Sequence, residues 1–178
     1  MKDQKGFTAW FTGLPCCGKT TIAKEVVKLL KDKGYKVEHL DGDIVRKDLT
    51  SELGFSKKDR NENIKRVTFV AKLLTRNNVA VMATFVSPYK KVREKSRKEI
   101  GNFVEIYVKC PVEECIKRDV KGMYKKALAG EIKNFTGVND PYEEPTNPEL
   151  VIYSDKETIE ESVDKVFNKL KELGYIYK

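Results

Sequence analysis

The sequence predicts an α/β fold of three layers, α/β/α, in which a central and mostly parallel sheet of five strands lies between two layers of helices. Three observations predict it. Strand and helix patterns alternate along the 178 residues, and a glycine-rich loop separates the first strand from the first helix. The run at 79–85 is apolar throughout, as in a strand buried on both faces. We therefore expect right-handed crossovers, with ligands bound at the carboxyl ends of the strands.

The individual elements follow from periodicity and from turn residues. The uncharged run FTAWFT predicts the first strand at 7–12, and apolar residues then recur at helical spacing from Ile22 until Gly34 ends the pattern. Further strands are predicted at 37–40, 79–85, 103–108 and 150–153. Further helices are predicted at about 44–49, at 59–76, after Pro88, at 111–118 and from Ile159 to Leu173. Between Arg118 and the last strand no regular period is visible, so we expect an irregular segment there.

A chain of 178 residues suits one domain, which we expect to span residues 1–178 with a lid segment at about 119–145. It contains no apolar run long enough for a membrane span and no apolar signal core, so we expect a cytoplasmic protein without a membrane partner. The four cysteines lack the paired spacing of a zinc site. The net charge of +8 suits either nucleic acid or nucleotides, but no RNA-binding motif or zinc finger is present, so we expect no nucleic-acid partner.

The loop between the first strand and the first helix reads GLPCCGKT, a G-x-x-x-x-G-K-T pattern. Its backbone N–H groups converge on an anion at a helix N-terminus, Lys19 neutralises the outer phosphates, and the Thr20 hydroxyl can ligate Mg²⁺. The alternative is a glycine-rich turn with a surface lysine. The pattern predicts a nucleoside triphosphate site that consists of Gly13, Leu14, Pro15, Cys16, Cys17, Gly18, Lys19, Thr20 and Thr21.

Two polar groups follow the second strand. Residues 41–43 read Asp-Gly-Asp, and a carboxylate here can accept the proton of an attacking hydroxyl or hold Mg²⁺, although this tripeptide is also a common turn. Arg46 and Arg60 offer planar guanidinium groups that suit phosphate or sulfate, with Phe55 between them and Asn63 nearby. The same residues could instead form an ordinary helix start with i,i+4 pairs.

Three further positions are candidates. Ser87 follows a buried strand and could donate a hydrogen bond to a substrate, although a Ser-Pro turn explains it equally well. The stretch around Lys121 is basic, and Phe135 lies in a turn near its end. A segment of this length favours a lid that excludes water, and the alternative is a disordered basic loop. His39, the only histidine, is predicted to be an ordinary strand residue.

Together these segments resemble adenylylsulfate kinase, the family that phosphorylates adenosine 5′-phosphosulfate (APS) on its ribose 3′-hydroxyl. The resemblance is carried by LDGD with Arg46, LGFS, DR-x-EN, SPY, RD-x-KG and the run from FTG to DPYE. It implies a P-loop kinase fold and transfer of the ATP γ-phosphate to APS, which gives 3′-phosphoadenylyl sulfate (PAPS) and ADP in sulfate assimilation. It also implies ATP and Mg²⁺ as cofactors and a homodimer.

The resemblance also implies roles for individual residues. The catalytic set would be Lys19, Asp41 and Ser87, and Thr20 with Asp41 would hold the metal. The APS contacts would be Asp43, Arg46, Phe55, Arg60, Asn63, Val86, Ser87, Lys121 and Phe135. Among them, Phe55 and Phe135 would present aromatic faces to the substrate adenine. Ser87 matches the serine traditionally labelled a phosphoenzyme intermediate in this family, although direct in-line transfer needs no such relay.

The chain departs from the family pattern at several places. Cys16-Cys17 replaces a pair of small residues, which would be strained at a positive φ and could make activity redox-sensitive. Ile44, Asp48 and Asn134 replace Asn, Gly and Gly, respectively. Two other functions remain as alternatives: a P-loop kinase of another small hydroxyl compound, such as shikimate or gluconate, and a non-catalytic nucleotide-responsive or RNA-binding module.

Overall fold

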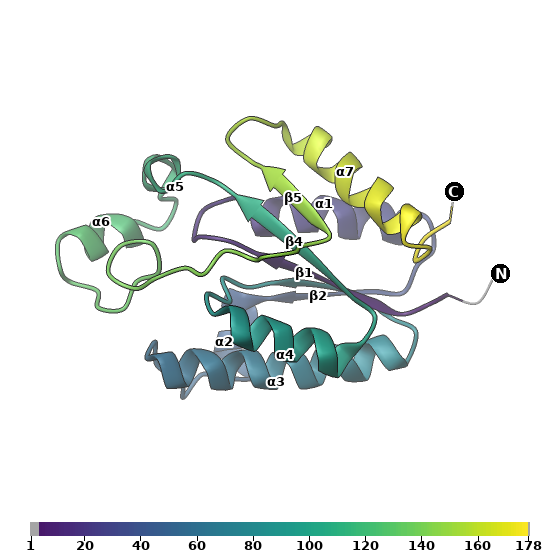
Figure 1. Ribbon diagram of the computed structural model, residues 1–178, viewed down its shortest axis with the longest axis horizontal. Coiled ribbons are helices and arrows are strands. Elements are labelled where there is room, and N and C mark those ends of the chain that lie inside the picture. Colours follow the sequence, from purple (N-terminus) through teal and green to yellow (C-terminus); the bar gives the residue numbers. More distant parts are fainter. Residues whose placement is uncertain (1–3, 178) are drawn as a thin grey trace.

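Five strands form the central sheet of this computed structural model, in the order β2-β3-β1-β4-β5 (Figure 1). All four strand pairings are parallel, so the predicted mostly parallel sheet of five strands is confirmed. The structure describes residues 4–177, and the other positions of the predicted domain, residues 1–3 and 178, lie outside this range. The strands are β1 (Phe7–Thr12), β2 (Val37–Asp41), β3 (Ala80–Thr84), β4 (Phe103–Lys109) and β5 (Leu150–Tyr153).

Helices cover both faces of this sheet, which confirms the three predicted layers. α1 and α7 lie on one face, and α3 and α4 lie side by side on the other (Figure 1). The helices are α1 (Lys19–Asp32), α2 (Gly42–Asp48), α3 (Lys57–Arg76), α4 (Lys90–Ile100), α5 (Val112–Arg118), α6 (Met123–Leu128) and α7 (Ile159–Glu172). β1 is the central strand. From β1 the chain continues to β2 on one side of the sheet, whereas from β3 it continues to β4 on the other side, so the carboxyl end of β1 lies at the topological switch point.

Alternating side chains on β1 explain why the sheet is buried on both faces. Phe7, Ala9 and Phe11 belong to the core under α1 and α7, whereas Trp10 belongs to the core under α3 and α4. All four are fully buried. Two of the long helices begin at side-chain caps: Ser56 accepts from the Asp59 N–H at the start of α3, and Thr158 forms a capping box with Glu161 at the start of α7. This framework holds the carboxyl ends of the strands in place.

The connection between α5 and β5 contains a short helix, α6, which contradicts the prediction of a wholly irregular segment. The Asp119 carboxylate accepts hydrogen bonds from the backbone N–H groups of Tyr124 and Lys125 and so caps the first turn. Gly122 precedes the helix in a left-handed conformation, with φ of 65°. Only Tyr124 and Ala127 of its six residues are buried, so the helix is too short to leave a periodic apolar pattern.

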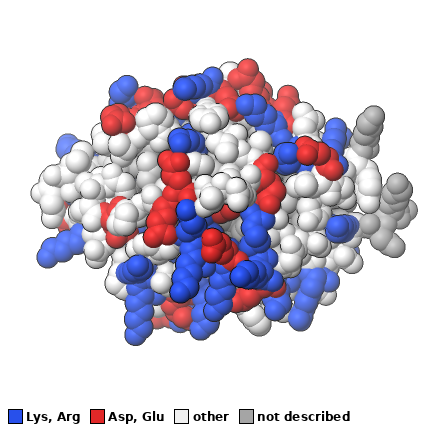
Figure 2. Space-filling model, viewed as in Figure 1, with Lys and Arg blue, Asp and Glu red and all other residues white. Residues whose placement is uncertain are grey.

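The surface carries charges of both signs. Figure 2 shows Asp and Glu interspersed with Lys and Arg, and basic side chains gather most densely below the centre, where Figure 1 places α3 and α4. The chain carries 35 Lys and Arg residues against 27 Asp and Glu residues, which gives its net charge of +8. Within residues 4–177, no helix has the length and apolar character needed to cross a membrane.

Candidate active site

The phosphate loop connects β1 to α1 at the switch point of the sheet. Gly13 has a φ of +151°, and a Cβ placed on it would come within 2.4 Å of the Val108 carbonyl oxygen, so only glycine fits. Gly18 precedes α1 with a φ of 100°, and no side chain caps the helix there. The first N–H groups of α1 are therefore not occupied by a side-chain cap and can bind an anion.

Lys19 is folded back over this loop. Its ammonium group donates to the carbonyl oxygens of Gly13 and Leu14, at 3.0 and 2.7 Å, and only 8% of the residue is exposed. These bonds hold the charge directly beside the open N-terminus of α1. The loop thus combines backbone donors with one fixed cation, the arrangement predicted for binding phosphates.

One member of the cysteine pair, Cys16, adopts the strained geometry that the sequence analysis considered. Cys16 is left-handed, with φ of 61°, and so is Asn134, with φ of 58°. Asn tolerates this region better than Cys does, so the strain falls mainly on Cys16. Burial raises the pKa of the Cys16 thiol, and Cys17 is fully buried. Both thiols are free.

Asp41 ends β2 beside the phosphate loop, as predicted. Its Oδ2 accepts from the hydroxyls of Thr20 and Thr84, at 2.9 and 3.1 Å, and its Oδ1 accepts from the Asp43 N–H at 3.0 Å. Burial alone would raise the pKa of Asp41, but these hydrogen bonds outweigh it and lower the pKa, so the carboxylate is ionised at neutral pH. A carboxylate and a hydroxyl are the hard oxygen donors that Mg²⁺ prefers, so Thr20 and Asp41 fit the predicted metal site.

Two guanidinium groups lie around the ring of Phe55. The Arg46 guanidinium carbon lies 4.4 Å from the ring centroid and that of Arg60 lies 6.0 Å from it, and 54% of Phe55 is exposed. Burial lowers the pKa of Arg46, and the nearby positive charge of Arg60 lowers it further. Asn63 is buried behind them, where its Oδ1 accepts from the Thr50 hydroxyl at 2.7 Å. The fold therefore brings this predicted group together as a local excess of positive charge.

The segment 119–149 reaches across the carboxyl ends of the strands. Lys121 pairs with Asp43 at the start of α2, and Arg60 of α3 donates to the Asn134 carbonyl and, at 2.7 Å, to the Thr136 hydroxyl. Each of these contacts joins the segment to a helix on the α2–α3 side. The predicted residues Asp43, Arg60 and Lys121 therefore lie in one region, although they are distant in the sequence.

The same segment also contacts the phosphate loop. Tyr124 donates from its hydroxyl to the Pro15 carbonyl at 3.1 Å, and Phe135 packs edge-on against the Tyr124 ring, with centroids 4.9 Å apart. Phe135 is only 8% exposed, so in this conformation it is a core residue rather than an open aromatic face. Sequence reasoning missed Tyr124, whose only signal is its position within the basic stretch.

Ser87 lies immediately after β3 in an unusual backbone conformation, with φ of 40°, and only 3% of it is exposed. Its hydroxyl accepts from the Trp10 indole N–H at 3.0 Å and donates to the Thr12 hydroxyl at 3.1 Å. The Thr12 hydroxyl in turn donates to the Val86 carbonyl at 2.8 Å. The Ser87 hydroxyl is thus satisfied both as a hydrogen-bond donor and as an acceptor.

A buried arginine that the sequence analysis did not single out supports this loop. Arg93 on α4 is 2% exposed and donates to the carbonyl oxygens of Ser87 and Glu143, each at 2.6 Å, and to Glu105 Oε1 at 2.8 Å. It therefore fastens the end of the segment 119–149 to the residues after β3. In the sequence Arg93 lies in the run KKVREKSRKEI, and no local pattern distinguishes it from the exposed basic residues of that run.

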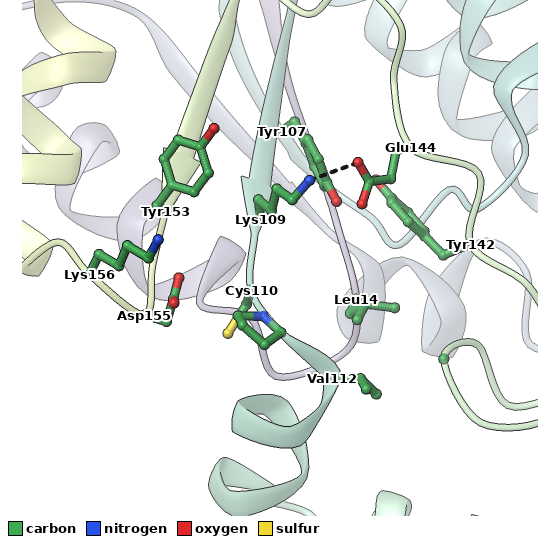
Figure 3. Close-up of a pocket in the computed structure, with 12 residues that line it drawn as sticks. Leu14, Tyr107, Lys109, Cys110, Val112, Tyr142, Glu144, Tyr153, Asp155 and Lys156 are labelled. Atoms are coloured by element: carbon green, nitrogen blue, oxygen red, sulfur yellow. Dashed lines mark hydrogen bonds and ion pairs between the residues drawn. The ribbon is translucent and has the colours of Figure 1, made fainter.

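A cavity of about 440 Å³ adjoins the phosphate loop at Leu14. Figure 3 shows its wall of aromatic and charged side chains from the ends of β4 and β5 and from the segment 119–149. Tyr107 stacks on Tyr142, with centroids 5.8 Å apart, and Lys109 pairs with Glu144 at 2.9 Å. Burial raises the pKa of both tyrosines, so both phenols stay protonated at neutral pH. Of the lining residues, only Leu14 belongs to the predicted set.

Comparison with known proteins gives consistent results. The model of the family described as Adenylylsulphate kinase matches residues 5–153. Adenylyl-sulfate kinase of Halothermothrix orenii is 59% identical over 99% of this chain and 95% of its own length. The solved structure titled as the Mycobacterium tuberculosis APS kinase CysC in complex with AMPPNP and APS matches with a TM-score of 0.90 and 39% identity, over 94% of this chain and 99% of that one.

A third match differs in length. The structure titled as the hexameric APS kinase from Thiobacillus denitrificans is 35% identical, with a TM-score of 0.76, and covers 98% of this chain but only 30% of its own. The family match covers most of the present chain, and the sequence relative spans nearly all of it. The chain therefore belongs to the adenylylsulfate kinase family.

Proposed function

We propose that this protein transfers the γ-phosphoryl group of ATP to the 3′-hydroxyl of APS, giving PAPS and ADP. One observation carries this proposal: the 2.9 Å hydrogen bond from Thr20 to Asp41, which places a carboxylate beside the end of the phosphate loop. A kinase needs such a group, because the attacking hydroxyl must lose its proton close to the γ-phosphate. Family membership and the relative solved with AMPPNP and APS support the choice of substrates.

In this mechanism the 3′-oxygen of APS forms a bond to the γ-phosphorus, the bond from that phosphorus to the β–γ bridging oxygen breaks, and ADP leaves. The loop N–H groups and Lys19 bind the phosphates and stabilise the charge that develops on them. Thr20 and Asp41 would hold Mg²⁺, which supplies further charge neutralisation when it is bound. Asp41 Oδ2 already accepts two hydrogen bonds, so Oδ1, which accepts one, is the oxygen that we propose takes the hydroxyl proton.

We propose that APS lies on the α2–α3 side of the phosphate loop. Arg46 and Arg60 would bind the phosphosulfate through their guanidinium groups, for which Arg60 would have to release Asn134 and Thr136. The exposed ring of Phe55 would stack on the adenine. The predicted contacts of Asp43, Asn63, Val86, Ser87, Lys121 and Phe135 would complete the site. Phe135 would have to leave its packing against Tyr124 to present its face to the base.

We also propose that the residues at about 119–145 act as a lid. Their contacts with α2, α3 and the phosphate loop support this role, because closure over both nucleotides would exclude water from the transfer. Without such exclusion, water would compete with APS for the γ-phosphate.

The decisive experiment measures ADP release by purified protein with Mg·ATP and APS, and separately with shikimate, gluconate or AMP. We expect turnover with APS only. Absence of APS-dependent turnover would sink the proposal, and turnover with gluconate or shikimate would favour the alternative kinase. RNA binding that requires no substrate and depends steeply on salt, together with no phosphotransfer, would favour the non-catalytic module.

A pair of phenylalanines on the same side of the fold sharpens this test. Phe55→Ala should raise the KM for APS by about 5- to 150-fold, since stacking on a base contributes about 1–3 kcal/mol. Phe69→Ala is the matched control, because Phe69 is 61% exposed on α3, and it should leave the KM unchanged. Equal KM values for both variants would favour a substrate without a base. Phe135→Ala is less informative, because Phe135 is a buried packing residue.

We further propose a homodimer in the cytoplasm. The dimer rests on the family resemblance, and relatives differ, since one solved neighbour is described as hexameric. Four free thiols in one chain favour a reducing compartment. Light scattering coupled to size exclusion should give about 41 kDa, twice the 20.4 kDa of the chain.

A further inference from the structure

A chain of hydrogen bonds links Asp41 on β2 to His39 on the same strand through Thr84 on β3. Thr84 Oγ1 donates to Asp41 Oδ2 at 3.1 Å, and His39 Nε2 lies 3.1 Å from the same threonine oxygen. His39 and Asp41 are two residues apart on β2, and Asp41 is in register with Thr84 on β3. Because side chains alternate along a strand, these three lie on one face of the sheet, the face that α1 covers.

The donors and acceptors in this line follow from a count of protons. A hydroxyl has one proton, and that of Thr84 is donated to Asp41. The Thr84 oxygen can therefore only accept from His39, so Nε2 of the ring must carry a hydrogen. The neutral Nε2–H tautomer and the imidazolium both satisfy this requirement, so the bond is the same whether the ring is neutral or charged.

The bond from His39 matters because a threonine hydroxyl is a rotor. Without a donor at its lone pair, the Thr84 hydroxyl is held by its bond to Asp41 alone, so the side chain loses the second contact that fixes its rotamer. A less firmly held Thr84 would in turn define the plane of the Asp41 carboxylate less well. Small errors in the placement of a catalytic group reduce the rate of the chemical step much more than they reduce binding.

We infer that His39 is a positioning residue for the transfer step: its Nε2–H fixes the Thr84 hydroxyl, which holds Asp41 Oδ2 and leaves Oδ1 for the substrate hydroxyl. This inference rests on the proposed role of Asp41 as proton acceptor. It assigns a function to the only histidine in the chain. In this role the ring acts on Asp41 through Thr84.

The first test needs no enzyme activity. Since the chain has one histidine, full-length untagged protein labelled with ¹⁵N-histidine gives one pair of imidazole nitrogen signals. We expect a proton on Nε2 in the wild type and loss of this fixed preference in Thr84→Val. A wild-type ring protonated on Nδ1 alone would overturn the inference.

The second test is a double-mutant cycle. His39→Leu and Thr84→Val should each lower kcat about tenfold, with the KM values for ATP and APS within about twofold of wild type. The double variant should be no slower than Thr84→Val, because Thr84→Val alone already removes the hydroxyl that connects His39 to Asp41. His39→Gln should recover most of kcat, since its amide can donate in place of Nε2–H. Additive losses, or a failure of glutamine to exceed leucine, would overturn the inference.

Thr8→Val is the matched control. Thr8 is a fully buried strand threonine whose hydroxyl bonds the Thr75 hydroxyl at 2.7 Å, away from Asp41. We expect wild-type kcat from this variant. A tenfold loss of kcat in Thr8→Val would overturn the inference, because removal of any buried strand hydroxyl would then have the same effect. The two proposals fail separately: a wild type inactive with APS rejects the proposed function but leaves the tautomer result intact.

Discussion

Replacing Ser87 with alanine distinguishes a phosphorylated serine from a serine that supports the fold. Ser87 is 3% exposed, and its hydroxyl accepts from the Trp10 indole N–H at 3.0 Å and donates to Thr12 at 3.1 Å. A phosphoenzyme would require this hydroxyl to leave both partners and to enter the site. The hydrogen bonds instead favour a structural role with direct transfer from ATP to APS.

The cost of Ser87→Ala can be worked from these contacts. The substitution leaves the Trp10 N–H without its acceptor, and Trp10 is fully buried. An unsatisfied buried donor costs about 1–3 kcal/mol of unfolding free energy. In a chain of this size about 2 kcal/mol lowers the melting temperature by roughly 4–8 °C. The kcat should fall less than tenfold, whereas loss of an obligatory nucleophile would lower it by about three orders of magnitude or more.

The assay combines thermal unfolding, steady-state ADP release and incorporation of label from γ-labelled ATP into protein. Ser96→Ala is the matched control, because Ser96 is a buried serine on α4 whose hydroxyl bonds Thr68 at 2.7 Å. Ser96→Ala should lower the melting temperature about as much as Ser87→Ala does, and its kcat and KM values should equal those of the wild type. A thousandfold loss of kcat in Ser87→Ala, together with label on wild-type Ser87 that passes to APS, would refute this reasoning.

Three further substitutions test the site and its support. Lys19→Met should lower kcat by at least about 100-fold with a melting temperature close to wild type, because the ammonium group acts on the developing phosphate charge; normal ADP release would contradict this role. Arg60→Gln should raise the KM for APS by about tenfold or more and leave the KM for ATP unchanged, since its guanidinium joins α3 to residues 134–136. Arg66→Gln, on the same helix but paired with Glu52 and Glu62, is its control and should leave both KM values unchanged. For Glu149, burial would raise the pKa, but the hydrogen bonds from Arg97 and the Glu105 N–H outweigh it and lower the pKa. Its stabilising contribution is therefore complete above the unfolded pKa of about 4.3 and is lost as the pH falls through the lower folded value. Glu149→Gln should flatten the acid limb of the stability curve below about pH 5, and exposed Glu94→Gln should retain the wild-type slope.

The sequence was sufficient for the features that local patterns specify. The strand at 7–12, the glycine-rich loop and the helix after it all follow from short-range apolar periodicity and turn residues. Asp41 could be placed beside Thr20 because parallel strands and the phosphate loop share one edge of the sheet. The roles of individual residues at that edge stay predictions until they are tested by substitution.

What local patterns could not supply were contacts between distant residues. Arg93 stands among surface lysines and arginines in the sequence, and its burial depends on Glu105 and on carbonyl groups from two other loops. Helix α6 depends on the Asp119 cap rather than on its own periodicity. His39 acquires a partner only because Thr84 comes from a neighbouring strand whose position the sequence does not state.

If the segment 119–149 acts as the proposed lid, its unequal attachment predicts the side on which it opens. Its far end is anchored by the buried Arg93, and the Glu143 N–H also donates to the Pro88 carbonyl at 2.8 Å. On the α2–α3 side, the segment is held by the largely exposed Lys121–Asp43 pair and by the hydrogen bonds that Arg60 donates to Asn134 and Thr136. We therefore expect the segment to pivot about its α4 side once Arg60 and Lys121 release it. APS would then enter, and PAPS would leave, between the segment and α2 and α3, without disturbing Ser87.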